Sequence, residues 1–556
     1  MRNKIIIIAI VLTAVWLAAT RVAFFRIDLT EEKRYSISEA AENQLKDMKE
    51  PLTLRLYLTG NLDANMARLK SEVKDLVTEM NMVSAERIEI EEIDPSEAAD
   101  DEERMANYRM LEDRGMRGLS VSDRSRSGQV TESVIFPWAE LCSSSDTMAI
   151  CLMNPGAQAT GEMSVNTAVG DVEFQIIDAV RVLNHATLKK IAFIEGHDEL
   201  PEPLTIDISD ALSRYFQVDR GVLGNDPSVL DPYSAIIIAK PEKPYSESDK
   251  FIIDQYIMHG GRVLWLIDGV QISDSLLSTG GMTPLLANDV NLSDQLFRYG
   301  VRITPTIVED MQCSYMPVNM AGHGEKPRFE PIPWTFSPLL QLSPLHPVTK
   351  TLADVKVDYA SGIEIVGDTT GVSKEVLMVT SNASHVTGAP SEIDIMQAMK
   401  VEPQEYFVHS YVPIGVALEG VFTSIYTHRT PPAGINARVT ETSKPTRMIV
   451  VADGDVLKND IQRTQQGIMY LPVGFDRVTQ QQHGNRDFVV NALLYLTDDE
   501  GIMQLRRRQM PVRMLNRVSV EQEYTAIAAW NVLLPIAILA LFGFVFIFLY
   551  KRRYAR

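Results

Sequence analysis

The first third of the chain alternates between the two spacings of apolar residues that distinguish strands from helices. Residues 52–59, LTLRLYLT, alternate in the manner of a strand, and RIEIEEIDP, ending in Asp94 and Pro95, predicts a second strand. Between them, apolar residues recur at helical spacing, namely Leu62, Met66, Leu69, Val73, Leu76 and Met80. We therefore expect a β-α-β unit, which opens a first α/β domain over residues 27–187.

From Lys190 onward, short Val/Ile-rich runs are interleaved with helical patterns. The runs KIAFIE, SAIIIAK and RVLWLID predict strands, and IDISDALSRYF and SESDKFIIDQYIMHGG predict helices between them. A later set, EVLMVTS, YVPIGVALEGVF and RMIVVAD, is followed by the helical pattern DFVVNALLYLT. Such interleaving favours a mostly parallel sheet covered on both faces, so we expect a second α/β domain over residues 188–505. Residues 316–348 contain seven prolines, and we expect this segment to be irregular.

Two apolar stretches flank this α/β body, at residues 5–25 and 526–550. The second carries no charge from Val532 to Tyr550 and precedes three cationic residues, Lys551, Arg552 and Arg553, so it is typical of a transmembrane helix with a cytoplasmic tail at 551–556. The first, within residues 1–26, fits either a retained anchor or a cleaved signal peptide, and we favour the anchor because no A-x-A triplet lies between Ala14 and Phe25. Two spans would leave both termini cytoplasmic and the body outside the cytoplasm, with residues 506–525 as a membrane-proximal linker.

Charge and cysteine content narrow the class of partner. The 556-residue chain carries a formal charge of −20, which disfavours nucleic acid as a partner because a phosphate backbone would be repelled. Three cysteines are too few for a disulfide framework. If residues 143–146 form a turn, Cys142 faces Thr147 and lies too far from Cys151 for a bridge.

The chain lacks the commonest local signatures of catalysis. The sequence contains no G-x-x-x-x-G-K-[ST] loop, so any ATP-driven step needs another subunit. It also lacks H-E-x-x-H, C-x-x-C and G-x-S-x-G. We therefore predict no catalytic residues, no metal site and no cofactor.

The strongest candidate site combines polar residues that follow three predicted strands. Glu195, His197 and Asp198 follow KIAFIE, Asp268 ends RVLWLID, and Asp453 ends RMIVVAD. Ligands of open α/β sheets bind at the carboxyl ends of strands, so these residues could line one rim and bind a ligand. Each also fits a structural role, as a polar turn or a helix cap.

Other polar residues have two interpretations each. His323 could be a ligand, although neighbouring glycines favour a flexible loop. Arginines 506 to 508 could contact headgroups or a partner, or form a solvated helix face. Asn531 and Pro535 in the second apolar stretch favour an intramembrane partner.

Several ordered segments resemble one known family along essentially the whole chain. They are FFRIDLTEEKRYSIS, IEIEEIDP, KIAFIEGHDE, NLSDQLFRYGVRI, IVEDMQC, LEGVFTSIY, VADGDVLKND and GNRDFVVNALLYLTDDEGI. Together they resemble the gliding-motility-associated ABC transporter auxiliary proteins of Bacteroidetes, the G component of that system, often labelled its substrate-binding protein. The resemblance implies an inner-membrane subunit that works with a separate ABC ATPase and a separate multi-span permease-like subunit.

The resemblance also implies a fold. The family's central α/β domain is similar to one in an intraflagellar transport protein and distantly like class I glutamine amidotransferases. Amidotransferase chemistry would need a cysteine at a strand-to-helix elbow, and Cys142, Cys151 and Cys313 do not occupy one. We therefore expect an amidotransferase-like sheet in a non-enzymatic binding or scaffold body. The alternatives are a periplasmic receptor for a ligand such as a saccharide, and a membrane-tethered hydrolase that uses the strand-end residues.

Overall fold

The structure, a computed structural model, describes residues 37–554 except for 61, 125–129, 154–161, 185–187, 274, 278–280, 320, 322–325, 327, 353, 368–370, 395–402, 465–466 and 508–523. The predicted N-terminal span, His323 and most of the linker at 506–525 lie outside the described residues. The chain divides into two units, Met1–Gln509 and Met510–Arg556, and each is described by itself.

A small four-stranded sheet in the order β2-β1-β5-β6 forms the first part of the larger unit. β1 (Leu52–Leu56) and β2 (Ile88–Glu92) are parallel, with α3 (Ala64–Val83) between them in the chain, which confirms the predicted β-α-β unit. β5 (Trp138–Cys142) and β6 (Thr147–Cys151) form an antiparallel hairpin. Cys142 pairs with Thr147 as predicted, and all three cysteines are free.

Helices bury one face of this sheet. Leu52, Leu54 and Leu56 alternate with half-buried residues along β1, and they share a hydrophobic core with the apolar face of α3. The other helices here are α2 (Glu39–Lys46), α4 (Asp101–Asp113) and α5 (Glu162–Asn184), and β3 (Leu119–Arg124) pairs with β4 (Val130–Ile135) in a separate hairpin. The same core continues through α5 to the large sheet.

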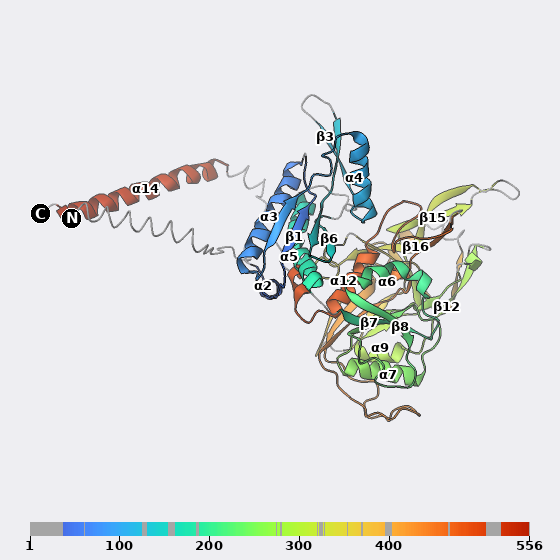
Figure 1. Cartoon of the computed structure of the whole chain (residues 1–556). Coiled ribbons are helices and arrows are strands. Elements are labelled where there is room, and N and C mark those ends of the chain that lie inside the picture. Colours follow the sequence, from blue (N-terminus) through green and yellow to red (C-terminus); the bar gives the residue numbers. More distant parts are fainter. Residues whose placement is uncertain are drawn as a thin grey trace. The chain divides into compact units, whose positions relative to one another are not determined.

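The large sheet has ten strands and is mixed (Figure 1). In the order β8-β7-β9-β10-β23, five strands are parallel: β8 (Phe216–Val222), β7 (Lys189–Glu195), β9 (Ala235–Ala239), β10 (Val263–Leu266) and β23 (Thr446–Val451). The others pair antiparallel: β22 (Pro413–Gly420), β19 (Val372–Val379), β16 (Phe329–Leu342), β15 (Cys313–Asn319) and β17 (Val355–Lys356). The prediction of a mostly parallel sheet therefore holds for one half only, because the strands beyond β23 alternate in direction.

Apolar side chains cover both faces of the parallel half. Ile237 belongs to the core that includes α6 (Ile206–Ser213) and α12 (Asn485–Leu496), whereas Ile236 and Ile238 belong to a second core with α7 (Glu247–Met258) and α9 (Ser293–Tyr299). This alternation follows from the two-residue period of a strand. It explains why the central strands are apolar without interruption, as the sequence indicated.

The expected irregularity of residues 316–348 is wrong where they form strands, at 316–319 in β15 and at 329–342 in β16. The longest of the described strands, β16, includes Pro331, Pro333 and Pro338. Pro331 pairs with Pro317 of β15, and Pro333 pairs with Tyr315. Because Pro331 and Pro333 are two residues apart, the backbone has the same orientation at both, and an N–H there would point away from β15. Among the described strands, β17 and β19 pair with β16 only at residues 339–342. No strand therefore lies beside Pro331 and Pro333 that would need the N–H groups that proline lacks.

Short elements complete the body. Small sheets pair β11 (Val270–Gln271) with β12 (Met282–Ala287) and β12 with β21 (Ser391–Asp394), β13 (Val301–Ile303) with β18 (Ile363–Ile365), β14 (Thr306–Asp310) with β20 (Ser384–Gly388), and β24 (Ile461–Thr464) with β25 (Gly467–Tyr470). Other short helices of the body are α11 (Pro403–Tyr406) and the 3-10 helices η1 (Glu202–Leu204), η2 (Asp455–Leu457) and η3 (Ile502–Arg507).

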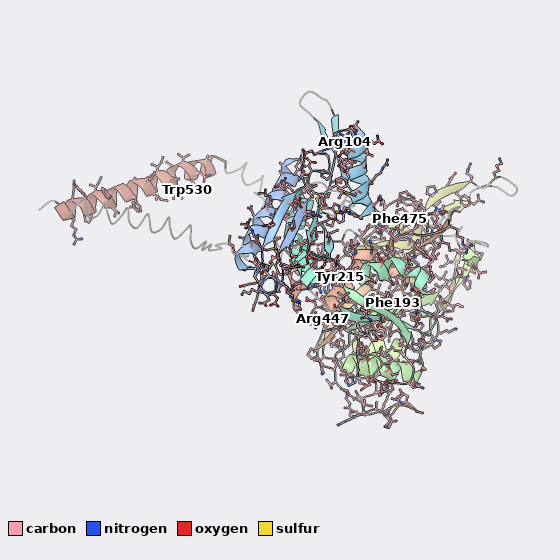
Figure 2. All side chains as sticks on the ribbon, viewed as in Figure 1. Arg104, Phe193, Tyr215, Arg447, Phe475 and Trp530 are labelled. Atoms are coloured by element: carbon pink, nitrogen blue, oxygen red, sulfur yellow. The ribbon has the colours of Figure 1, made fainter. Side chains whose placement is uncertain are left out.

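The second unit contains the helix α14 (Tyr524–Tyr554), which includes Pro535. Within it, Ala528–Arg552 is long and apolar enough to cross a membrane, and it is the one such helix among the described residues. Large apolar side chains such as Trp530 are exposed along it (Figure 2). A helix that is apolar all round in this way suits lipid surroundings, as expected for residues 526–550.

Candidate functional site

The parallel strands bring three charged residues to one edge of the large sheet. Ala239 of β9 is in register with Leu266 of β10, which is in register with Val451 of β23. The residues that follow these positions, Lys240, Asp268 and Asp453, therefore reach the same edge. With Asp455, they form the strand-end cluster. The structure thus brings together Asp268 and Asp453, which the sequence placed on one rim, and adds Lys240, which sequence reasoning missed.

Lys240 joins the carboxylates of this cluster. Its Nζ lies 3.3 Å from Asp268 Oδ2 and also contacts Asp455 Oδ2. Asp455 Oδ1 is 3.0 Å from the ammonium group of Lys458. Lys240 has a φ of 55°, a left-handed conformation that non-glycine residues rarely adopt, and these ion pairs help to hold it there.

Backbone N–H groups satisfy the remaining carboxylate oxygens. The N–H of Gly454 donates to Asp268 Oδ1 at 2.5 Å, and those of Asp455 and Asp358 donate to the two oxygens of Asp453 at 2.7 and 2.9 Å. Asp453 has no exposed surface. The cluster is therefore closed on itself, and a ligand would have to displace one of these contacts.

The pKa directions follow from this arrangement. Burial alone would lower the pKa of Lys240, but the Asp268 and Asp455 carboxylates raise it. Burial raises the pKa of Asp453 well above its usual value, and the neighbouring charges of Asp455 and Asp268 raise it further. Burial also opposes ionisation of Asp455, yet Lys240 and Lys458 lower its pKa below the usual value. Lys240 and Asp455 thus form a buried ion pair beside a carboxyl group that resists ionisation.

His197 lies in a separate network after β7. Its Nδ1 is 3.2 Å from Glu199 Oε1, and its Nε2 is 3.3 Å from Asp249 Oδ2. The ring stacks on Tyr245 at 3.6 Å between centroids. Burial alone would lower the pKa of His197, but the Glu199 and Asp249 carboxylates raise it. With both nitrogens facing carboxylates, the imidazole is stabilised as a doubly protonated cation, which is the wrong state for a general base.

The other two predicted site residues are held apart from the cluster. Glu195 Oε1 is 2.8 Å from Arg220 Nε, and β9 separates β7 from β10 in the sheet. Asp198 is exposed and lies 2.8 Å from Lys243. Among the described residues, no three His, Cys, Asp or Glu side chains are arranged to hold a metal ion.

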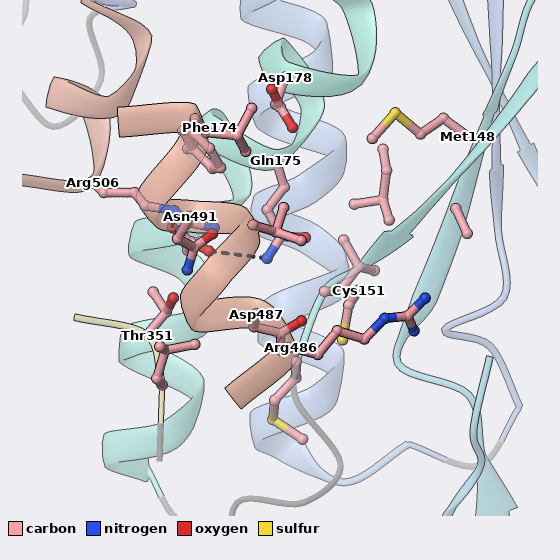
Figure 3. Close-up of a pocket in the computed structure, with 18 of the residues that line it drawn as sticks. Met148, Cys151, Phe174, Gln175, Asp178, Thr351, Arg486, Asp487, Asn491 and Arg506 are labelled. Carbon is pink, nitrogen blue, oxygen red and sulfur yellow. Dashed lines mark hydrogen bonds and ion pairs between the residues drawn. The ribbon is translucent and has the colours of Figure 1, made fainter. Parts of the chain in front are cut away.

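A cavity of about 560 Å³ lies elsewhere in the body, between the small sheet, α5 and α12 (Figure 3). Its wall comes from residues 114–115 after α4, Trp138 of β5, β6 and the two residues after it, α5, the end of α6, residues 350–352, α12 and η3. Met148 and Cys151 line it from β6, Gln175 from α5, and Asn491 from α12. Sequence reasoning could not find this cavity because no two wall segments are linked by a local motif.

Arg506 of η3 is the most constrained charge on this wall. Its Nε is 3.2 Å from Asp171 Oδ1, and its guanidinium carbon lies 3.9 Å from the centre of the Phe174 ring. Lys350 Nζ donates to the carbonyl oxygen of Arg506 at 2.6 Å. Only 8% of Arg506 is exposed, so the interpretation of this arginine as part of a solvated face is wrong. The side chain of Arg507 and the whole of Arg508 lie outside the described residues.

Polar and titratable groups complete the wall. Gln175 donates to Asp171 Oδ2 at 3.0 Å, and Asn491 donates to the carbonyl of Val348 at 3.1 Å. Burial raises the pKa of the Cys151 thiol to about 12, which leaves it unreactive at neutral pH. The pKa of Asp487 is also raised, chiefly because protein surrounds it, although its side chain is exposed to the cavity.

Comparisons with known proteins identify the family to which the chain belongs. A search of curated proteins gives no match. A solved structure of the mmIFT52 N-terminal domain is 10% identical, with a TM-score of 0.32, covering 56% of this chain and 98% of its own. Residues 31–141 match a domain of unknown function. Residues 188–492 match the ABC transporter auxiliary family described as "ABC-type uncharacterized transport system". Because this match extends over more than half of the chain, the protein belongs to that family.

Proposed function

We propose that this chain is a non-enzymatic, membrane-anchored subunit of an ABC-transporter-like complex. The observation that carries the proposal is the family match over residues 188–492, which contain most of the large sheet. The apolar helix Ala528–Arg552 supports membrane attachment. The body would act as a binding or scaffold part of the complex, in two domains divided near residue 187.

The proposed partners are an ABC ATPase subunit and a multi-span permease-like subunit. The chain has no nucleotide-binding P-loop, so ATP hydrolysis must occur in another subunit. A transmembrane helix is a direct route by which the body could sense that hydrolysis. Asn531 and Pro535 of α14 are the positions where we propose contact with the permease-like subunit.

We further propose an inner-membrane location, with the body periplasmic and both termini cytoplasmic. Lys551, Arg552 and Arg553 directly after the apolar stretch support a cytoplasmic C-terminus. The same orientation requires that residues 5–25 form a retained span. A role in gliding motility or envelope transport, as in the Bacteroidetes family that the sequence resembles, belongs to this proposal.

The geometry of the strand-end residues supports a non-catalytic body. His197 faces carboxylates through both ring nitrogens, and Asp268 and Asp453 accept bonds from the backbone. A saccharide receptor or a hydrolase built on Glu195, His197, Asp198, Asp268 and Asp453 would have to break these contacts. We therefore propose that these residues stabilise the sheet edge.

Co-purification from native membranes tests the proposed complex. Affinity purification of the full chain in mild detergent should recover an ABC ATPase and a multi-span membrane protein at constant ratio. The matched control replaces residues 528–552 by an unrelated single transmembrane helix, which keeps the chain in the membrane and should reduce recovery of both proteins. Absence of both from the unmodified chain's purification would refute the proposal.

A further inference from the structure

We infer that the cavity between β6, α5, α12 and η3 binds a small ligand through an anionic oxygen group, a carboxylate or a phosphate. The site would centre on Arg506. Ligand binding by the isolated chain does not depend on partner subunits. The ligand site can therefore be disproved while the proposed complex stands, and the complex can be disproved while the ligand site stands.

The size and composition of the cavity suit a small polar ligand. Small-molecule sites usually measure about 300–1,000 Å³ and place a few polar groups on a largely apolar wall. This cavity measures about 560 Å³ and combines apolar residues such as Met148, Ile150 and Phe174 with convergent charged groups.

The charges on the wall favour an anion. Its cationic residues are Arg114, Arg214, Lys350, Arg486 and Arg506, against the carboxyl groups of Asp171, Asp178 and Asp487. Asp178 is balanced by Arg181, whose guanidinium lies 2.6 Å from its carboxylate. A cationic cavity in a chain of formal charge −20 is a local reversal of the overall charge.

Arg506 supplies the specific anchor. Its Nε and Nη1 are buried, and neither has a hydrogen-bond partner among the described residues, although Nε lies 3.2 Å from Asp171 Oδ1. Leaving such a donor unsatisfied costs about 1–3 kcal/mol, and more for a charged group. Asp171 occupies only the Nε side of the guanidinium, and Gln175 holds the second oxygen of Asp171. A ligand carboxylate or phosphate could therefore bind Nη1 without displacing Asp171, in the geometry that guanidinium groups favour.

The weak pair that Arg486 makes leaves it able to contribute. Arg486 is 3.7 Å from Asp207, too far for a strong bond, so it can turn toward an anion at modest cost. Arg114 instead lies 3.2 Å from the buried carboxylate of Glu140, and the position of Arg506 is fixed by Phe174.

The test measures thermal unfolding of the purified full chain in detergent at low salt. Inorganic phosphate and citrate serve as the two probes, and chloride at equal ionic strength serves as the reference for salt effects. We expect a saturable rise in Tm with at least one probe, because a ligand that binds only the native state stabilises it. A response to phosphate alone or to citrate alone identifies the group that the site prefers.

Two cavity variants and one control locate the response. Arg506→Gln should abolish the rise, and Arg486→Gln should weaken apparent affinity at least several-fold while leaving the packing of Arg506 intact. Arg447→Gln is the matched control, since Arg447 also pairs with a carboxylate, Glu419 at 3.0 Å, and stacks on an aromatic ring, Tyr495, outside the cavity. It should keep the rise in full.

Two results would overturn the inference. One is a wild-type chain whose Tm with phosphate and with citrate does not exceed that with chloride. The other is a rise of equal size in wild type, Arg486→Gln and Arg447→Gln, which would identify a non-specific salt effect even if Arg506→Gln did not fold.

Discussion

Two clusters of buried charge in this body differ in whether they are complete. In the strand-end cluster, Lys240 contacts two carboxylates, backbone N–H groups bond to Asp268 and Asp453, and the second oxygen of Asp455 lies 3.0 Å from Lys458 Nζ. In the cavity, Arg506 contacts one carboxylate, and its Nη1 has no partner among the described residues. The first arrangement stabilises a fold, and the second has room for a ligand.

The difference follows from where the residues come from. The strand-end cluster lies at adjacent parallel strands, whose register brings backbone N–H groups close to the side chains. The cavity lies where separate segments meet, and no regular backbone pairing fills the space between them. Charge at a strand end is therefore weaker support for a binding site here than charge on a cavity wall.

Removing the central cation should have the largest effect. Lys240→Met leaves Asp268 and Asp455 buried beside each other without their shared counter-charge, and we expect a loss of about 3–5 kcal/mol in the free energy of unfolding. Urea titration of the full chain in detergent measures it. Lys243→Met is the control three residues away, because its pair with Asp198 is exposed and should contribute less than about 1 kcal/mol. Equal effects of the two substitutions would show that the cluster is not closed.

Crowding the same cluster should have an intermediate effect. A Cβ at Gly454 would lie 2.4 Å from Lys240 Cβ, so Gly454→Ala must displace Lys240 and should cost about 1–3 kcal/mol. Gly170→Ala in α5 is the control, since nothing lies within 4 Å of the added atom and alanine favours a helix by about 1 kcal/mol. Unfolding titrations should thus give changes of opposite sign, and a neutral Gly454→Ala would contradict the tight packing of Lys240.

A change on the cavity wall should have the smallest effect. Asp487→Asn should alter the free energy of unfolding at pH 7 by no more than about 0.5 kcal/mol, because the side chain faces open space. The pKa of Asp487 is raised in the folded state, so the protonated side chain favours folding. This contribution to stability is fully present below the unfolded-state pKa of about 3.9 and is lost as the pH rises through the folded-state pKa. Wild type should therefore lose stability relative to Asp487→Asn over that rise. A destabilised variant at pH 7 would instead indicate a structural role like that of Asp455.

The sequence was enough to predict that Asp268 and Asp453 lie at the same sheet edge. It was not enough to predict that they form a closed cluster with Lys240. Both follow apolar strand patterns, and parallel strands end at one edge. Which strands are neighbours depends on pairing across the chain, so Glu195 could not be separated from the pair in advance. Lys240 directly follows the apolar run SAIIIA, so its place at the end of a strand was as clear from the sequence as that of Asp268.

The proline-rich strand and the cavity show the limits of local patterns. Prolines argue against a strand unless its neighbours are known, and β16 tolerates them because one side has few ladder partners. Arg506 lies in an arginine run typical of a solvated surface, yet Asp171 and Phe174 bury it. Contacts between residues more than 300 positions apart determine both its burial and the cavity.

Photo-crosslinking within α14 tests the central claim most directly. A photo-crosslinking amino acid in place of Asn531, in intact membranes of the native host, should give a specific covalent product with a multi-span subunit of an ABC-type transport system. Adducts with lipid alone, from a chain that is present in the membrane at normal abundance, would contradict the assignment of this protein as a subunit of such a complex.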